Sequence, residues 1–322
     1  MRVFAAAVAL IAAIAPVAAQ DSPGRAITLV VPFAAGGPMD AVGRMLAPRM
    51  SELLRQPMII ENVGGAGGMN GSARVAKAIP DGSQIVLGNF GTHAANQTFF
   101  QNPLYNAATD FSPVALIAEV PFVLITRNNL PTGNLREFIA FAKANKEKMQ
   151  YGSGGAGSAT HIACLLFNTV IGVNVTHVPY RGGGPALQDL IGGRIDYQCL
   201  DTPVAIPQIE SGTVKAIAIF TRARSPSLPN LASAHEQGLT DFEATNWIGL
   251  FLPKDTPADV VARFHAAAVA TMDTPSIQER LKTLGAVVVT PERRSPGYLQ
   301  KFVAGEIEKW AAPIKASGVS SP

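Results

Sequence analysis

A glycine turn between an apolar run and a helix pattern is the first part of this sequence suited to bind a ligand. The turn Phe33-Ala34-Ala35-Gly36-Gly37 follows the β-branched run at 27–31. Pro38 suits the first turn of a helix, where its missing N–H costs nothing. A strand, a turn and a helix in this order leave N–H groups without partners, and these attract carboxylates and phosphates. An ordinary tight turn explains this stretch equally well.

A second glycine turn repeats this design at residues 152–161, between a short strand pattern and a helix pattern. It adds side-chain hydrogen-bonding groups to the backbone N–H groups. The positions suited to a ligand are Ser153, Gly154, Ser158, Thr160 and His161. Two helix starts of this kind favour an anionic solute.

Polar side chains also follow other predicted strands. Asn89 and Thr92 come directly after the strand pattern at 84–88, and ligands bind at the carboxyl edge of an open α/β sheet. Tyr180 and Arg181 follow another strand. Arg181 either pairs with a ligand carboxylate or is a solvated surface charge.

Two acidic residues each have two interpretations. Asp40 contacts a ligand, or it only favours the dipole in the first turn of its helix. Asp201 faces the cleft and accepts a hydrogen bond from a ligand hydroxyl or amine, or it caps the next helix. We expect His93 and His161, both after polar turns, to line the cleft as hydrogen-bond donors.

Several chemistries lack their sequence signals. The stretch from Gly152 to Gly157 satisfies G-x-G-x-x-G, but the acid expected about 20 residues later is missing, and the first acid is Asp189. There is no P-loop and no G-x-S-x-G nucleophile turn. Histidines and cysteines lack metal-site spacing, so we predict no metal and no cofactor. An exported enzyme remains the competing class, with Ser153 and His161 as the pair to test.

The length and composition indicate a bilobed globular protein. The chain has 322 residues, more than one compact core usually holds, and 48% are hydrophobic. Its formal charge of +3, without a Lys/Arg cluster, argues against nucleic acid as a partner.

The N-terminus resembles a secretory signal. Arg2 precedes an apolar run at 3–17, and small residues at 17–19 suit cleavage after Ala19. We therefore predict a signal peptide at 1–19 and a periplasmic mature protein. Export permits a disulfide between Cys164 and Cys199, but two buried thiols are the favoured interpretation.

The remaining pattern alternates strands with helices in two series. The first has strands near 27–31, 58–61 and 84–88. A second begins at 122–126, after an apolar segment at 111–120, and continues with strands near 149–152, 174–178, 195–200 and 214–220. A strand at 247–252 returns to the first series, and helices follow at 257–272, 276–284 and 296–314. The chain thus crosses twice between two α/β lobes that enclose a cleft.

The combined motifs resemble the substrate-binding proteins of tripartite tricarboxylate transporters, often called the Bug family. The matching segments cover nearly the whole mature chain: 27–37 with Asp40, 61–68, 91–93, 151–153, 157–158, His161, 177–182, Asp201 and Ala311. Together they are far more specific than any single motif.

This resemblance implies a type II periplasmic binding protein, with α/β lobes at 20–120 plus 246–322 and at 121–245. It implies that the loops at 33–39 and 153–161 receive the two ends of a small carboxylate. It also implies that the lobes close about a hinge near 115–120 and 247–252, and that a membrane permease is the partner. Presentation of the ligand to a sensor kinase is a second role. We expect a monomer without enzyme activity, and a di- or tricarboxylate, an aromatic acid or an acidic amino-acid relative as ligand.

Overall fold

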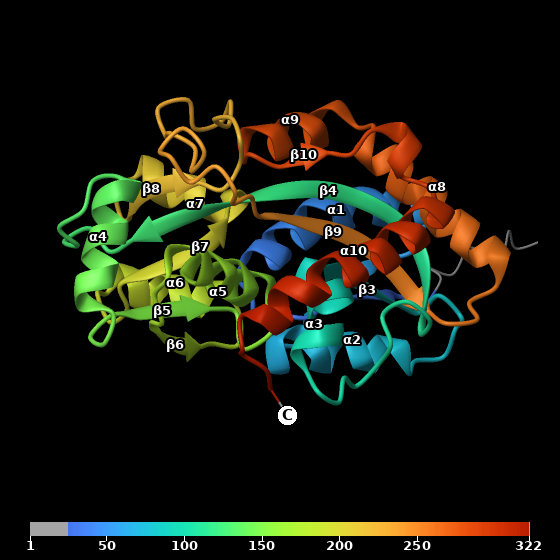
Figure 1. The fold of residues 1–322 in the computed structure, drawn as a ribbon. Helices are drawn as coiled ribbons and strands as arrows, with labels where there is room; N and C mark the ends of the chain where they lie inside the picture. The colour runs from blue at the N-terminus through green and yellow to red at the C-terminus, as the bar shows by residue number, and fades with distance from the viewer. Residues whose placement is uncertain (1–24, 322) are drawn as a thin grey trace, which may run out of the picture.

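The computed structural model describes residues 25–321. The predicted signal peptide lies outside these residues. Figure 1 shows two lobes side by side, each a sheet covered by helices, with a long strand, β4, extending through both.

The first lobe contains the first strand series. Its parallel strands lie in the order β2-β1-β3, and β9 adds to β3 in the antiparallel direction. These strands are β1 (Ile27–Val31), β2 (Met58–Asn62), β3 (Gln84–Asn89) and β9 (Thr245–Pro253). The helical segments between them are α1 (Pro38–Leu54), η1 (Ala66–Gly68), α2 (Met69–Ala76), the π-helical η2 (Gly91–Ala95) and α3 (Asn96–Phe99).

The second lobe repeats this plan. Strands β7, β5 and β6 are parallel neighbours, while β4 pairs with both β7 and β8 in the antiparallel direction. Its strands are β5 (Gln150–Ser153), β6 (Thr176–Pro179), β7 (Tyr197–Asp201) and β8 (Lys215–Ile219). Its helices are α4 (Leu135–Asn145), α5 (Ala159–Ile171), α6 (Gly183–Ile191) and α7 (Thr202–Glu210). The sequence suggested α7 only through the interpretation of Asp201 as a helix cap.

Strand β4 (Phe111–Thr126) is continuous, whereas the sequence suggested two separate apolar segments. Pro121 is the reason for that difference, because proline lacks the N–H that a central strand donates. In the structure Pro121 stands opposite Thr245 of β9, and the next N–H, of Phe122, bonds to Ala244. The chain therefore enters the second lobe within β4 and returns at the start of β9.

The C-terminal part returns to the first lobe. The elements of this part are α8 (Ala258–Met272), α9 (Pro275–Thr283), β10 (Val287–Val288), η3 (Pro291–Arg293) and α10 (Pro296–Ala316). Helix α10 packs on η2, α3 and β4, while β10 pairs with β4. Buried apolar side chains form one cluster in each lobe and a third that extends through both.

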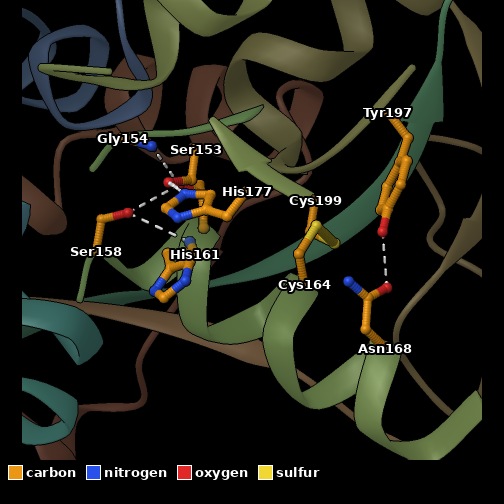
Figure 2. Close-up of a disulfide and its surroundings, with 10 residues drawn as sticks. Ser153, Gly154, Ser158, His161, Cys164, Asn168, His177, Tyr197 and Cys199 are labelled. Carbon is orange, nitrogen blue, oxygen red and sulfur yellow. Dashed lines mark hydrogen bonds between the residues drawn. A yellow bond between two sulfur atoms is a disulfide. The ribbon is translucent and has the colours of Figure 1, made fainter. Parts of the chain in front are cut away.

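Cys164 and Cys199 form a disulfide, so the expectation of two free thiols is wrong. Cys164 lies on α5 and Cys199 on β7, and α5 packs against that strand so that the two Cα atoms are 5.5 Å apart. Figure 2 shows the bond to the right of Ser153, Ser158 and the two histidines. Only the packing of α5 on β7 could reveal this pairing, because 35 residues separate the cysteines in sequence.

Candidate functional site

A cavity lies between the two lobes. Its volume is about 20 Å³, little more than a single water molecule needs. Its walls come from both glycine turns, from the ends of β3 and β7 and from the start of α6. The lining residues are Phe33, Pro38, Met39, Asn89, Gly154, Ser158, Ala159, Thr160, Gly183 and Asp201.

Four of the described helices begin at this cavity. They are α1, α5, α6 and α7, whose N-cap residues are Gly37, Ser158, Gly182 and Asp201. Each helix start carries a partial positive charge and N–H groups without intrahelical partners. Among the described lining residues none is Lys, Arg or His. The positive partial charges that face the cavity therefore come from backbone groups, which suit an anion, while Asp201 adds one acidic side chain to the lining.

Asp40 fixes the shape of the first turn. Its Oδ2 accepts hydrogen bonds from the N–H of Gly36 and from Arg44, both at 2.9 Å. Its Oδ1 accepts one from Asn62 at 3.0 Å, and Asn62 also donates to the Phe33 carbonyl. Burial alone would raise the pKa of Asp40, but the hydrogen bonds from Arg44, Gly36 and Asn62 together lower it. Asp40 thus stays ionised and holds the turn.

The second turn presents two hydroxyls to the cavity. Ser158 caps α5, and its Oγ accepts a hydrogen bond from the His161 N–H at 3.2 Å (Figure 2). Thr160 Oγ1 lies 3.2 Å from Ser158 Oγ and accepts one from the Gly154 N–H at 2.9 Å. These bonds hold both hydroxyls at the start of α5, where they can donate to an anion together with the backbone.

Asp201 lies in the cavity wall at the end of β7. It is only 3% exposed, and its Oδ1 accepts a 2.7 Å hydrogen bond from Asn246 of β9. Burial raises the pKa of Asp201 to about 7, although the bond from Asn246 opposes that change. Asp201 is thus a buried acid without a positive partner among the described residues.

The lobes meet at a line of glycines, here called the glycine seam. It consists of residues whose added Cβ would press on the backbone of the opposite lobe: Gly64, Gly67, Gly91, Gly155, Gly182 and Gly184. A hydrogen bond of 3.0 Å from the Ala34 N–H to the Arg181 carbonyl also crosses between the lobes. The lobes approach this closely only because side chains are absent from the seam.

The comparisons with known proteins give the family. The model of the tripartite tricarboxylate transporter family receptor matches residues 42–319. The chain belongs to this receptor family. The family's other name, Bug, appears in the solved periplasmic binding protein BugD, to which the chain is 39% identical with a TM-score of 0.90, over 93% of this chain and 100% of BugD.

Two further solved proteins are similar over most of their length. MatC from Rhodopseudomonas palustris, solved with malate, is 40% identical with a TM-score of 0.88, over 91% of this chain and 99% of MatC. A second R. palustris protein, solved with adipate, is 34% identical with a TM-score of 0.87, over 93% of this chain and 99% of that protein. These matches confirm the predicted bilobed α/β fold, and membership of this receptor family implies the periplasm. Within residues 25–321, no helix has the length and apolar character needed to cross a bilayer.

In this receptor, six of the predicted site residues line the cavity: Phe33, Asn89, Gly154, Ser158, Thr160 and Asp201. Four further lining residues were not named individually: Pro38, Met39, Ala159 and Gly183. Pro38, Met39 and Ala159 fall within the loops at 33–39 and 153–161 that the family resemblance assigned to the ligand. Gly183 was missed, although it lies only two residues after the predicted Arg181, at the start of α6.

The other predicted site residues lie around the cavity. The first turn continues after Phe33 with Ala34, Ala35, Gly36 and Gly37. The Thr92 hydroxyl forms a hydrogen bond with the Asn89 side chain. Tyr180 donates its hydroxyl to Asp189 at 2.7 Å. The Arg181 side chain is exposed, and its carbonyl accepts the bond from Ala34.

The histidines differ most from expectation. His93 is fully buried and stacks on Phe251, with ring centroids 4.0 Å apart, so it does not line the cleft. Burial lowers the pKa of His93 to about 3. His161 borders a different cavity and accepts a hydrogen bond from the Gly157 N–H at 3.1 Å.

Ser153 pairs with another histidine than the one predicted. Its Oγ lies 2.7 Å from His177 Nε2 and not against His161 (Figure 2). Ser153 is fully buried and outside the cleft lining, so its hydroxyl braces the turn through the N–H and carbonyl of Gly155.

Replacing Asp40 by alanine is expected to lower the free energy of unfolding by about 2–3 kcal/mol. This change leaves the Gly36 N–H and the Asn62 amide without their acceptor, and bonds to charged groups are worth about 1.5–3 kcal/mol each. Because folding lowers the pKa of Asp40, its contribution is present above the ordinary value of 3.8 and is lost as the pH falls through the folded-state value. Urea unfolding at pH 7 measures the effect.

Glu61→Ala is the matched control. Glu61 also pairs with an arginine of the first lobe, Arg74, but its side chain is 46% exposed against 5% for Asp40. An exposed pair contributes about 1 kcal/mol or less. Equal losses in the two variants would contradict the role assigned to Asp40.

Proposed function

We propose that this protein captures a small carboxylate between its lobes and delivers it to the membrane permease of a tripartite tricarboxylate-type transporter. The convergence of four helix N-termini on one cavity carries this proposal. Oriented N–H groups bind carboxylates without a cationic side chain. The malate and adipate in two similar receptors support the same ligand class.

The ligand class is a di- or tricarboxylate, an aromatic acid or an acidic amino-acid relative. The narrow cavity favours the smaller of these. Carboxylate recognition divides between the start of α1 in the first lobe and the starts of α5, α6 and α7 in the second. A ligand held from both sides stabilises the closed arrangement.

Closure is proposed to occur between a lobe of residues 20–120 and 246–322 and a lobe of residues 121–245. The proposed hinge ranges, 115–120 and 247–252, lie on paired segments of β4 and β9. In these ranges β9 is also paired with β3, and β4 with β10, so closure would bend two strands that the first-lobe sheet holds on both sides.

The proposed setting is a periplasmic monomer exported by a signal peptide cleaved near Ala19. The closed form docks on the permease, and presentation of the ligand to a sensor kinase is a second role. The protein is proposed to be a non-enzyme. Burial of Ser153 and its bonds within its own turn support this, because a nucleophile must reach its substrate.

The test is a thermal-shift screen of the mature protein with small carboxylates at pH 7.5, after denaturation and refolding to remove any bound ligand. A ligand at one hundred times its Kd stabilises the folded state by about 2.7 kcal/mol. A rise in Tm with one acid supports the proposal. If no acid raises Tm in the refolded protein, the proposal fails.

Ser158→Ala is expected to weaken carboxylate binding about 5- to 30-fold, because it removes a hydroxyl donor worth about 1–2 kcal/mol from the cavity wall. Loss of the α5 cap should also cost about 1 kcal/mol of stability. Ser295→Ala is the matched control, since Ser295 caps α10 away from the cavity. Calorimetric titration should show unchanged affinity for that control. Equal affinities in both variants would remove Ser158 from the site.

A further inference from the structure

Asp201 has one carboxylate oxygen that accepts no hydrogen bond from any other residue in the range 25–321. Its Oδ1 accepts the hydrogen bond from Asn246, whereas Oδ2 has no partner from another described residue. The backbone N–H of Asp201 itself is a further donor to this carboxyl group. Asp201 lines the cavity and is 97% buried as a residue, so the small surface that it keeps borders the ligand space.

The orientation of the Asn246 side-chain amide fixes which group Asp201 contacts. Its Oδ1 accepts a hydrogen bond from the Phe90 N–H at 3.3 Å, so its NH₂ group must face Asp201. Asn246 is fully buried and lies on β9, where its backbone belongs to the central sheet. The amide therefore satisfies one oxygen of Asp201 and cannot turn to serve the other.

The N–H groups at the helix starts donate hydrogen bonds and so suit a carboxylate ligand. The ionised Oδ2 of Asp201, which lies beside them, can only accept a hydrogen bond. A carboxylate placed beside Oδ2 would bring two acceptors together without a proton between them. Burying an acceptor without a donor is costly, and more so for a charged group. A donor on the ligand removes this cost.

We infer that the preferred ligand is a small carboxylate bearing a hydroxyl or ammonium group near the carboxylate, and that Asp201 Oδ2 accepts a hydrogen bond from that group. This inference rests on the proposed carboxylate-binding function. Asp201 then selects among acids that the helix starts would bind equally well. A site built around a hydrogen bond discriminates strongly against an analogue that lacks the donor.

The test compares acids that differ only at C2, at pH 8, by calorimetric titration. Succinate, malate and aspartate carry hydrogen, hydroxyl and ammonium there. Glutarate, 2-hydroxyglutarate and glutamate extend the set by one carbon, and phenylacetate, mandelate and phenylglycine provide the aromatic series. The donor-bearing acid of at least one series should bind about 10- to 100-fold more tightly than its parent. Whether the hydroxyl or the ammonium acid binds best identifies the donor.

Asp201→Asn is expected to change the ligand preference and not merely to weaken binding. Because Asn246 presents its NH₂ group, the new amide must turn its oxygen toward Asn246 and its own NH₂ toward the cavity. The acceptor facing the ligand becomes a donor. The preference for the donor-bearing acid should fall to about 3-fold or less, while the parent acid binds more tightly than to the unsubstituted protein.

Asp241→Asn is the control, because Asp241 is an exposed acid of the second lobe outside the cavity. If parent and donor-bearing acids bind equally and Asp201→Asn changes neither, the inference is overturned while the carboxylate function stands. A parent acid that binds only with uptake of a proton would also overturn it, since Asp201 would then share a proton with the ligand. If no acid binds, the proposed function itself fails.

Discussion

Gly91→Ala is expected to weaken carboxylate binding about 10- to 100-fold while both lobes remain folded. Gly91 lies in the glycine seam, and an added Cβ would stand 2.5 Å from the backbone nitrogen of Ala159, at the start of α5. Its φ is not positive, so alanine fits the local backbone. The clash therefore acts between the lobes, where overpacking costs about 1–3 kcal/mol.

That cost is paid only in the closed arrangement. A variant whose closed form is less populated binds more weakly by the same factor, and each 1.4 kcal/mol corresponds to tenfold. Calorimetric titration with the tightest acid of the screen gives the affinity, and small-angle X-ray scattering reports whether the ligand still contracts the protein. We expect contraction of the unsubstituted protein and little contraction of Gly91→Ala.

Gly305→Ala is the control for this prediction. Gly305 is also helical, within α10, but nothing lies within 4 Å of an added Cβ. Alanine there should leave affinity unchanged and raise stability by up to about 1 kcal/mol. Unchanged affinity in Gly91→Ala would show that the liganded lobes do not meet at the glycine seam.

Removing the disulfide by Cys164→Ala and Cys199→Ala together is expected to lower the free energy of unfolding by about 3–4 kcal/mol. The bond closes a segment of 35 residues, and the chain-entropy model gives a cost of this size for such a loop. The Tm should fall by roughly 5–10 °C. Scanning calorimetry measures the change, and carboxylate affinity should alter much less, because neither cysteine lines the cavity.

Unfolding of the unsubstituted protein in urea, with and without reductant, separates the bond from side-chain packing. Both cysteines are fully buried, so reductant should act only on the unfolded chain and lower the urea midpoint. Identical midpoints with and without reductant would contradict a stabilising role for this disulfide.

The sequence was sufficient where the signal is local. Strand β1, the turn at Phe33 to Gly37 and the start of α1 at Pro38 follow from neighbouring residue types, as does the capping of α5 by Ser158. These short-range patterns also carried the family resemblance, which the family match confirmed. The lining positions Phe33, Gly154, Ser158 and Thr160 in the two turns were predicted for the same reason.

Only the tertiary structure showed which polar groups face the cavity and which stabilise the fold. Asp40 and Asp201 looked alike in sequence, yet Asn62 and Arg44 engage the first, while Asn246 leaves one oxygen of the second open to the cavity. The disulfide, the burial of His93 and the glycine seam likewise depend on contacts between residues far apart in the chain. Local periodicity indicates which face of a helix or strand is apolar, but it does not indicate which other element packs against that face.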